Sequence, residues 1–351
     1  MLTVVHGIAV LLSLGQEMKT FISSMLERGS LARAFVAIIS IAGLWLPLSP
    51  AVAQAWPSRP IRLIVPYPAG GAADLHARIL QAPLSQLLGQ QIVIENKSGA
   101  GGIIAFESVA RAPADGYTLL FGAGAMTVAP SLYAKLSFDV VNDFEPITTL
   151  VLLQNVLTVP ADSPLKSVPE LIAYAKSHPG KMTFASSGVG ATPHLTVELF
   201  KQMAGMNIVH VPYRGDTPAY LALMSHQVDM FFSTLGGGVS YIRGGKVRAL
   251  AVSSQQRSPI LPEVPPLADY VPGFNIVSWF GLLAPKGTPA GIVNKLNSAV
   301  RTLLAKPEIQ KAYLDLGSEP STDTPAEFRE LIRSNVKTFA AIAKAANIKP
   351  E

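Results

Sequence analysis

Two stretches of the chain, more than 100 residues apart, share one plan: an apolar run, a glycine-rich turn and a helix-like segment. The first reads LIVPYPAGGAADLHARIL (63–80) and the second reads MTFASSGVGATPHLTVELF (182–200). In each, the apolar run predicts a buried strand, and the residues after the glycines predict a helix that begins where the strand ends. Such a corner presents backbone N–H groups, whereas a catalytic loop would present a nucleophile or a base. The pattern therefore favours holding a ligand over transforming one.

The chemistry of these corners favours an anionic ligand. The first N–H groups of a helix have no partners within the helix, and together with the helix dipole they attract a negative group without any basic side chain. Gly70 and Gly71 at the first corner, and Gly188 and Gly190 at the second, would let a ligand approach the backbone closely. Two such corners facing each other would hold a molecule with a negative group at each end, such as a dicarboxylate. The alternative is that the glycines only make the corner, as they do in most α/β folds.

The rest of the chain from Trp56 alternates short apolar runs with amphipathic segments of helix length. This alternation predicts α/β architecture with largely parallel sheets. The predicted strands are 61–65, 92–95, 117–121, 156–159, 182–185, 209–211, 230–232 and 249–252, and the predicted helices include 73–88, 168–177, 193–204 and 218–225.

Because the two similar stretches lie far apart, we place one in each of two lobes. The apolar, extended segments 146–160 and 278–285 suit two crossings between the lobes. The first lobe then comprises 56–157 and the helical segment 280–351, and the second comprises 158–279. In the helical segment, TPA at 288–290 and at 324–326 predicts two helix starts, with Thr288 and Thr324 as N-caps.

Residues 1–55 have the pattern of a secretory signal peptide. Arg28 and Arg33 precede an apolar stretch of about a dozen residues, and Ala-x-Ala spacing follows. We expect export to the periplasm with cleavage after Ala53 or Ala55; an uncleaved anchor is the alternative. The first 24 residues are long for such a signal, so Met18 or Met25 could be the true start.

Composition excludes several classes of function. The chain has no cysteine, so every thiol or thiolate–metal mechanism is excluded. No run of Lys and Arg is longer than two, which disfavours nucleic-acid binding. The histidines lack metal-binding spacing such as H-E-x-x-H, and the turn GAGG (99–102) lacks the remainder of a dinucleotide fingerprint. We therefore expect no metal and no cofactor.

Six segments, in the order in which they occur, resemble the extracytoplasmic solute-binding proteins of tripartite tricarboxylate transporters, the Bordetella uptake gene (Bug) group. They are WPSRPIRLIVPYPAGGAADLHAR, LGQQIVIENKSGAGGIIAFESVARAPADGYTLLFG, FASSGVGATPHLTVELFKQMAG, VHVPYRGDTPAYLAL, GGKVRALAVSS and LAPKGTPAGIVNKLN. The resemblance implies a two-lobed, type II-like periplasmic-binding-protein fold with the ligand between the lobes. It also implies a monomer that delivers a small carboxylate to membrane permease subunits: a di- or tricarboxylate, an aromatic acid or an acidic amino acid.

The resemblance also implies which residues contact the ligand. In the first lobe the residues are Tyr67, Ala69, Gly70, Gly71 and Asp74; in the second they are Ser187, Gly190, Thr192, His194, Tyr213, Gly215 and Asp229. Two of these residues have an alternative role: Asp74 could instead cap its own helix, and His194 could instead be packed or solvated.

Departures from the family pattern affect ligand identity more than fold. Pro83 falls inside the first long helix and predicts a kink or an early break. The segment STLGGGVSYIRGG (233–245) has an extra glycine cluster, which we expect in a loop that lines the cleft.

Two alternative functions remain open at this stage. A ligand-sensing protein that docks onto a membrane receptor would need the same cleft as a transport protein. A secreted serine hydrolase is disfavoured, since G-x-S-x-G is absent and Ser186 or Ser187 lies on the same short loop as His194.

Overall fold

The computed structural model describes residues 19, 23, 56–188 and 192–346. The account below concerns the compact unit Trp56–Glu351. The proposed signal segment, 1–55, with its cleavage sites, lies outside the described residues apart from positions 19 and 23.

The first half of this unit is built on a mixed sheet. β1 pairs in parallel with β2 and β3, β3 pairs antiparallel with β9, and β9 pairs antiparallel with β4. The short β10 adds to β4. The strands are β1 (Ile61–Val65), β2 (Ile92–Asn96), β3 (Thr118–Ala123), β4 (Phe144–Pro160), β9 (Val277–Pro285) and β10 (Glu319–Pro320).

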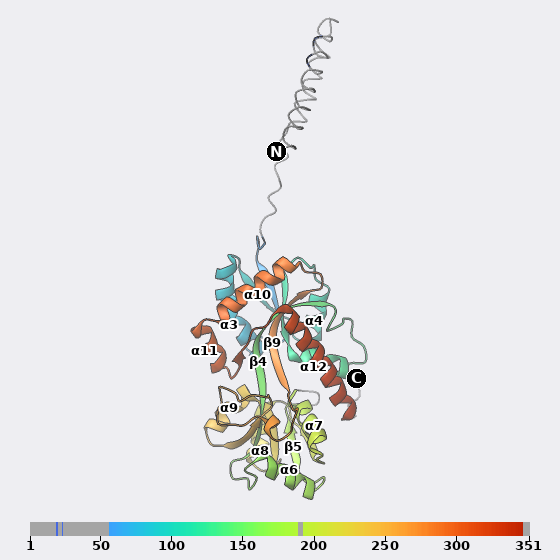
Figure 1. Ribbon diagram of the computed structural model, residues 1–351, viewed down its shortest axis with the longest axis vertical. Helices are drawn as coiled ribbons and strands as arrows, with labels where there is room; N and C mark the ends of the chain where they lie inside the picture. Colours follow the sequence, from blue (N-terminus) through green and yellow to red (C-terminus); the bar gives the residue numbers. More distant parts are fainter. Residues whose placement is uncertain (1–18, 20–22, 24–55, 189–191, 347–351) are drawn as a thin grey trace, which may run out of the picture. The chain divides into compact units, whose positions relative to one another are not determined.

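The second half shares β4 with the first. β4 pairs with β9 as far as Gln154, and from Asn155 onward it pairs with β7 and β8. β5 is parallel to both β6 and β7. The added strands are β5 (Thr183–Ser186), β6 (Val209–Pro212), β7 (Met230–Thr234) and β8 (Val247–Val252). The two segments expected to cross between the halves are thus parts of β4 and β9, which run side by side through the middle of the molecule (Figure 1).

The strand directions make the two halves face each other. β4 runs in the same direction as β1, β2 and β3, because β9 is antiparallel to both β3 and β4. β4 continues into the second half, so the carboxyl ends of β1 to β3 point toward that half. β5, β6 and β7 run against β4, so their carboxyl ends point back toward the first half. In open α/β sheets, ligands bind beyond the carboxyl ends of the strands.

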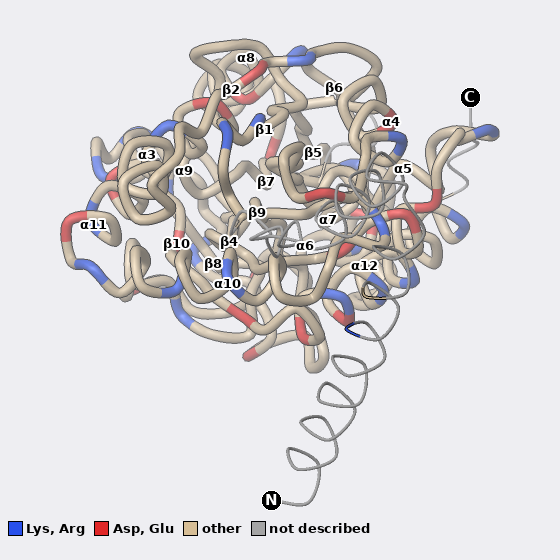
Figure 2. Tube along the Cα trace, turned by 90° about the horizontal axis from the view of Figure 1, so that it is seen from above, with Lys and Arg blue, Asp and Glu red and all other residues tan. Residues whose placement is uncertain are grey.

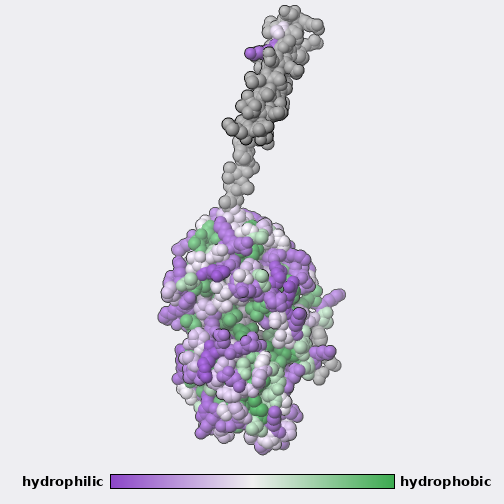
Figure 3. Space-filling model, viewed as in Figure 1, coloured by the Kyte–Doolittle hydropathy of each residue, from purple (hydrophilic) through white to green (hydrophobic). Residues whose placement is uncertain are grey.

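Helices cover both halves and bury the sheet between them. α3, α10 and α11 pack on one core cluster with β1 and β3, and α6 and α7 pack on another with β5 and β7. Hydrophobic side chains gather at mid-height on the viewed face, where the halves meet (Figure 3). The helices are α3 (Ala72–Leu88), α4 (Ile103–Ala110), α5 (Ala129–Leu132), α6 (Val168–Ser177), α7 (Thr192–Ala204), α8 (Asp216–Met224), α9 (Leu235–Arg243), α10 (Ala290–Leu304), α11 (Pro307–Asp315) and α12 (Pro325–Ala345), with short 3-10 turns at Ala100–Gly102, Gly124–Thr127 and Leu267–Asp269.

The helix α12 contacts both halves. Phe328 and Ile332 in its first part pack in the cluster around Trp279, whereas Phe339 and Ile342 further along belong to the core of the second half. Its start is a capping box in which Thr324 accepts from the Glu327 N–H, so the predicted N-cap is confirmed.

The other start signal in this segment was predicted one residue early. The N-cap of α10 is Pro289 and has no side-chain cap. The hydroxyl of Thr288 instead donates to the Pro285 carbonyl.

Two further local expectations fail. The early break considered at Pro83 does not occur, since α3 runs through it to Leu88, with Leu80 and Leu84 buried on its apolar face; the kink considered there as the other outcome remains a prediction. The glycine cluster at 236–238 lies in the helix α9 and not in a loop, because Thr234 caps that helix by accepting from the Gly237 N–H. The missing side chains have a packing reason: a Cβ on Gly236 would lie 2.7 Å from the Leu316 carbonyl oxygen.

Candidate ligand-binding site

The turn from β1 into α3 carries the predicted first-half residues and presents open backbone. Ala69 and Gly70 are exposed, and a Cβ on Gly70 would meet no atom within 4 Å. Gly70 has φ 77°, which glycine adopts without strain. The N-cap of α3 is Gly71, and no side chain caps this helix. The first N–H groups of α3 are therefore offered at the carboxyl end of β1.

The carboxylate of Asp74 serves its own turn. It accepts from the Gly70 N–H (2.9 Å), from Arg78 Nε (2.8 Å) and from Asn96 Nδ2 (3.1 Å). The hydrogen bond from Arg78 is the main reason why its pKa falls to about 2, and burial works against this shift. Of the two roles considered for Asp74, these contacts favour the structural one. They also engage the Gly70 N–H internally.

Tyr67 lies half-buried beside the turn. Its carbonyl accepts from Asn96 Nδ2 at 3.0 Å, so Asn96 joins the end of β2 to the turn after β1. Burial raises the pKa of the Tyr67 hydroxyl to about 12, with a smaller contribution from Tyr133. The Tyr67 side chain therefore remains a neutral hydrogen-bonding group at neutral pH.

In the second half, the turns after β5 and β6 are joined by backbone hydrogen bonds. The Tyr213 N–H donates to Ser186 O at 2.9 Å, and the Gly215 N–H donates to Ser187 O at 3.2 Å. Gly215 is the N-cap of α8, with φ 107° and no side-chain cap. The structure thus brings Ser187, Tyr213 and Gly215 together at one edge. Gly190 lies outside the described residues.

The helix α7 begins at Thr192, and His194 lies buried in its first turn. The ring of His194 stacks on His210 with 4.0 Å between centroids and 14° between planes. His210 Nε2 lies 2.6 Å from Ser186 Oγ. Burial is the main cause that lowers the pKa of both imidazoles to about 4. Of the two roles considered for His194, this arrangement favours packing, even though His194 lies in the first turn of the helix that follows β5.

Asp229 lies at the opposite end of its strand from this edge. It precedes β7, and its carboxylate accepts from the Thr183 N–H (2.7 Å) and Thr183 Oγ1 (2.8 Å) at the start of β5. It therefore joins the amino ends of two parallel strands, and the structure does not bring it together with the other predicted residues.

Sequence reasoning missed the acidic group that does lie at the facing edge. Asp216 begins α8, and its Oδ2 accepts from Thr234 Oγ1 at 3.0 Å. Burial raises its pKa, whereas hydrogen bonds from Thr234 and Ser187 oppose that rise. The sequence does contain a signal for this group, because Asn96, Asp216 and Thr234 each come shortly after a predicted strand.

Helix starts are of two kinds. α6, α9 and α12 have side-chain caps from Ser167, Thr234 and Thr324, and α9 follows β7, whose carboxyl end also lies at the facing edge. None of these three helices follows β1, β2 or β6. The helices α3, α4 and α8 follow these strands and have glycine N-caps without side-chain caps. Their N-caps are Gly71, Gly102 and Gly215. The GAGG turn (99–102), which the sequence predicted only as a turn, therefore ends at Gly102, the N-cap of α4. It supplies a third helix start without a side-chain cap.

A cavity of about 370 Å³ adjoins the start of α3 and the start of α9. Its walls come from both halves: the first two turns of α3, the middle of β4, the start of α9 and the turn at 316–318. Most of its lining side chains are apolar. It is the hollow between the halves that a ligand held at the start of α3 would reach.

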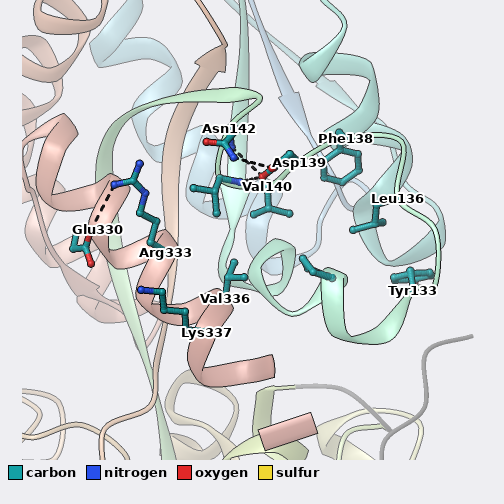
Figure 4. A pocket seen from close by; sticks show the side chains of 12 residues that line it. Tyr133, Leu136, Phe138, Asp139, Val140, Asn142, Glu330, Arg333, Val336 and Lys337 are labelled. Carbon is teal, nitrogen blue, oxygen red and sulfur yellow. Dashed lines mark hydrogen bonds and ion pairs between the residues drawn. The ribbon is translucent and has the colours of Figure 1, made fainter. Parts of the chain in front are cut away.

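A larger hollow of about 840 Å³ lies elsewhere, between α12 and residues 130–142 (Figure 4). Glu330, Arg333 and Lys337 reach it from α12, and Leu136 and Phe138 lie on the opposite wall. None of the predicted site residues line it, and all its walls belong to the first half. Volume alone does not make it the site.

The described residues do not meet the requirements of a metal site or of a membrane-spanning helix. No group of three or more His, Cys, Asp or Glu residues is placed to hold a metal there. None of the helices described is both long enough and apolar enough to cross a bilayer. Lys and Arg are interspersed with Asp and Glu around the molecule (Figure 2).

Comparison with known proteins identifies the family. Residues 76–348 match the tripartite tricarboxylate transporter family receptor. The chain belongs to this family. It is 34% identical to Protein BugT of Bordetella pertussis over 314 residues, which is 89% of this chain and 95% of BugT.

Solved structures with bound acids are similar to this receptor-family chain. An R. palustris protein with adipate is 35% identical and has a TM-score of 0.71, covering 84% of this chain and 100% of that one. MatC from Rhodopseudomonas palustris with bound malate is 32% identical, with a TM-score of 0.67, and covers 82% and 100%. The predicted Bug resemblance and the two-lobed periplasmic-binding-protein fold are thereby confirmed. The lobe boundaries and the ligand contacts remain predictions.

Proposed function

We propose that this protein captures a small carboxylated solute between its two lobes and delivers it to a tripartite tricarboxylate-type permease. One observation carries the proposal: uncapped, glycine-started helices follow parallel strands whose carboxyl ends face one another across the two halves. Their free N–H groups are suited to a carboxylate. The adipate and malate in the two similar structures support the same ligand class.

Binding of the ligand would increase the population of the closed state of the protein. A solute that touches both halves only when they are close favours that arrangement, and β4 and β9 would bend to permit it. The dual packing of α12 would limit the direction of the motion, since its two ends belong to different cores.

We also propose that the protein is a periplasmic monomer without catalytic activity. Export would remove the chain up to Ala53 or Ala55. The mass of the protein purified from the periplasm tests the cleavage, and its elution volume in size-exclusion chromatography tests the monomer. The Ser186–His210 pair supports the absence of catalysis, since Ser186 is fully buried. Turnover of an ester that is lost in Ser187→Ala and His194→Ala would contradict it.

A thermal-shift screen of the purified protein against mono-, di- and tricarboxylic acids tests the proposed function. We expect at least one acid to raise the melting temperature, and its uncharged amide to have little effect. Stabilisation by cations or uncharged solutes, with no response to any acid, would contradict the proposal.

A further inference from the structure

The cavity between the halves differs in character from the open turns beside it. Five large apolar side chains line it, from α3, β4, α9, β9 and the 316–318 turn, and no Lys or Arg does. They are Leu75, Leu153, Leu235, Phe280 and Leu316. This wall is therefore suited to hydrocarbon and offers no cation for a carboxylate.

The polar side chains that line the cavity already use their hydrogen-bond donors within the protein. His76 is buried and hydrogen-bonds through Nδ1 to the Ala72 carbonyl (2.6 Å) and through Nε2 to Ser318 Oγ (2.7 Å). Gln154 is also buried and donates through Nε2 to Glu319 at 2.7 Å. Its Oε1 has no hydrogen-bond partner among the described residues. The cavity's side-chain donors are thus already engaged, and a carboxylate buried without a partner is costly.

The cavity is continuous with the proposed carboxylate site. Ala72, the first residue of α3, lines it. On the other wall, Gly237 lies so close to Asp216 that a Cβ would come within 2.5 Å of Oδ2, and Asp216 begins α8. An acid held at the start of α3 would thus extend its carbon body between these walls. A cavity of roughly 150 Å³ can take a benzene ring, so about 370 Å³ accepts a ring or chain with substituents.

We infer that this cavity is an apolar subsite and that the ligand is a monocarboxylic acid with an aryl or alkyl body, not a di- or tricarboxylate. The inference rests on the proposed function and narrows its ligand class. One carboxylate binds at the start of α3, and the uncharged end of the molecule fills the cavity.

Matched pairs of acids test this by isothermal titration calorimetry of the purified protein. Hexanoate and adipate differ only in the terminal carboxylate, as do 4-methylbenzoate and terephthalate. We expect the monoacid of at least one pair to bind at least tenfold more tightly than its diacid, and hexanamide to bind more weakly than hexanoate.

A second experiment introduces a positive charge into the cavity. Leu75→Arg places a cation in its wall at a position 43% exposed, so the fold should tolerate it. We expect the preference to shift toward the diacid by at least tenfold. Leu87→Arg, on the same helix and 48% exposed, is the matched control and should leave the preference unchanged.

The outcomes separate the two proposals. Diacids that bind the unaltered protein as tightly as monoacids would overturn the apolar subsite and leave the carboxylate function standing. An equal shift in Leu87→Arg, or none in Leu75→Arg, would also overturn the subsite. Binding of hexanamide as tight as that of hexanoate, or no binding of any of the four acids to folded protein, would overturn both proposals.

Discussion

Gly236 and Gly317 touch backbone to backbone across the two halves. Gly236 lies in the first turn of α9, and Gly317 lies in the turn between α11 and β10. A Cβ on Gly317 would overlap the Gly236 Cα, and Gly317 has φ 72°. The two glycines therefore set how closely the halves approach beside the cavity.

Substitution of Gly317 by alanine should destabilise the protein through both strain and overlap. Gly245→Ala is a matched control, since Gly245 has φ 66° and nothing within 4 Å of a Cβ. We expect the control to lose about 1–2 kcal/mol from the left-handed backbone alone, and Gly317→Ala to lose about 1–3 kcal/mol more from overpacking. Chemical denaturation measures both. Equal losses would show that the contact is unimportant.

An acidic residue at the start of α3 should compete with the ligand and still stabilise the helix. Ala72→Asp places a carboxylate where we propose the solute's carboxylate binds. We expect binding of the best acid to fall at least tenfold, while stability stays level or rises by about 0.3–1 kcal/mol. Ala290→Asp makes the same change at the uncapped start of α10, which follows the carboxyl end of β9 and so faces away from the gap. It should not affect affinity, and parallel losses in both variants would contradict the assignment.

The stacked pair His194–His210 should make the protein less stable in acid. Burial lowers the pKa of both groups from the ordinary 6.5 to about 4, so the unfolded chain takes up protons that the folded protein does not. Their contribution is complete above pH 6.5 and is lost as the pH falls toward 4. Because Glu198 and Lys201 also lie near the pair, the comparison uses His210→Gln, which leaves them in place. Its unfolding free energy should fall less than that of the unaltered protein between pH 7.5 and 4.5; identical slopes would contradict this account.

Asp229→Ala should weaken folding without weakening binding. The carboxylate joins β5 to β7 through Thr183 at the amino ends of the strands. We expect a loss of about 0.5–1.5 kcal/mol in the free energy of unfolding, because the hydrogen bonds from Thr183 to this exposed carboxylate are lost, and an unchanged affinity for acids. A large loss of affinity in folded Asp229→Ala would place Asp229 back in the site.

Local signals predicted much of the fold, because strand and helix periodicity are properties of short segments. The predicted strand 61–65 and the predicted helix 168–177 match β1 and α6 in both bounds. The errors arose where distant contacts decide. The glycines at 236–238 lie in a helix whose surroundings leave no room for side chains: Leu316 packs against Gly236, Asp216 against Gly237 and Tyr220 against Gly238. No local pattern contains that information.

The candidate site shows the same limit. The turn at Gly70 and Gly71 was predicted because glycine next to a strand end is visible in the sequence, whereas Tyr67 and Ala69 came from the family resemblance. Asp229 was predicted and Asp216 was missed, since each adjoins a strand and only the strand directions place one of them at the facing edge. The apolar cavity is assembled from α3, β4, α9 and the 316–318 turn, which lie far apart in the chain.

A crystal structure of the protein with an acid selected by the thermal-shift screen tests the central claim most directly. We predict a carboxylate oxygen within hydrogen-bonding distance of the first free N–H groups of α3, with the second half closed over the solute. A bound acid remote from these helix starts, for example in the hollow beside α12 (Figure 4), would contradict the claim.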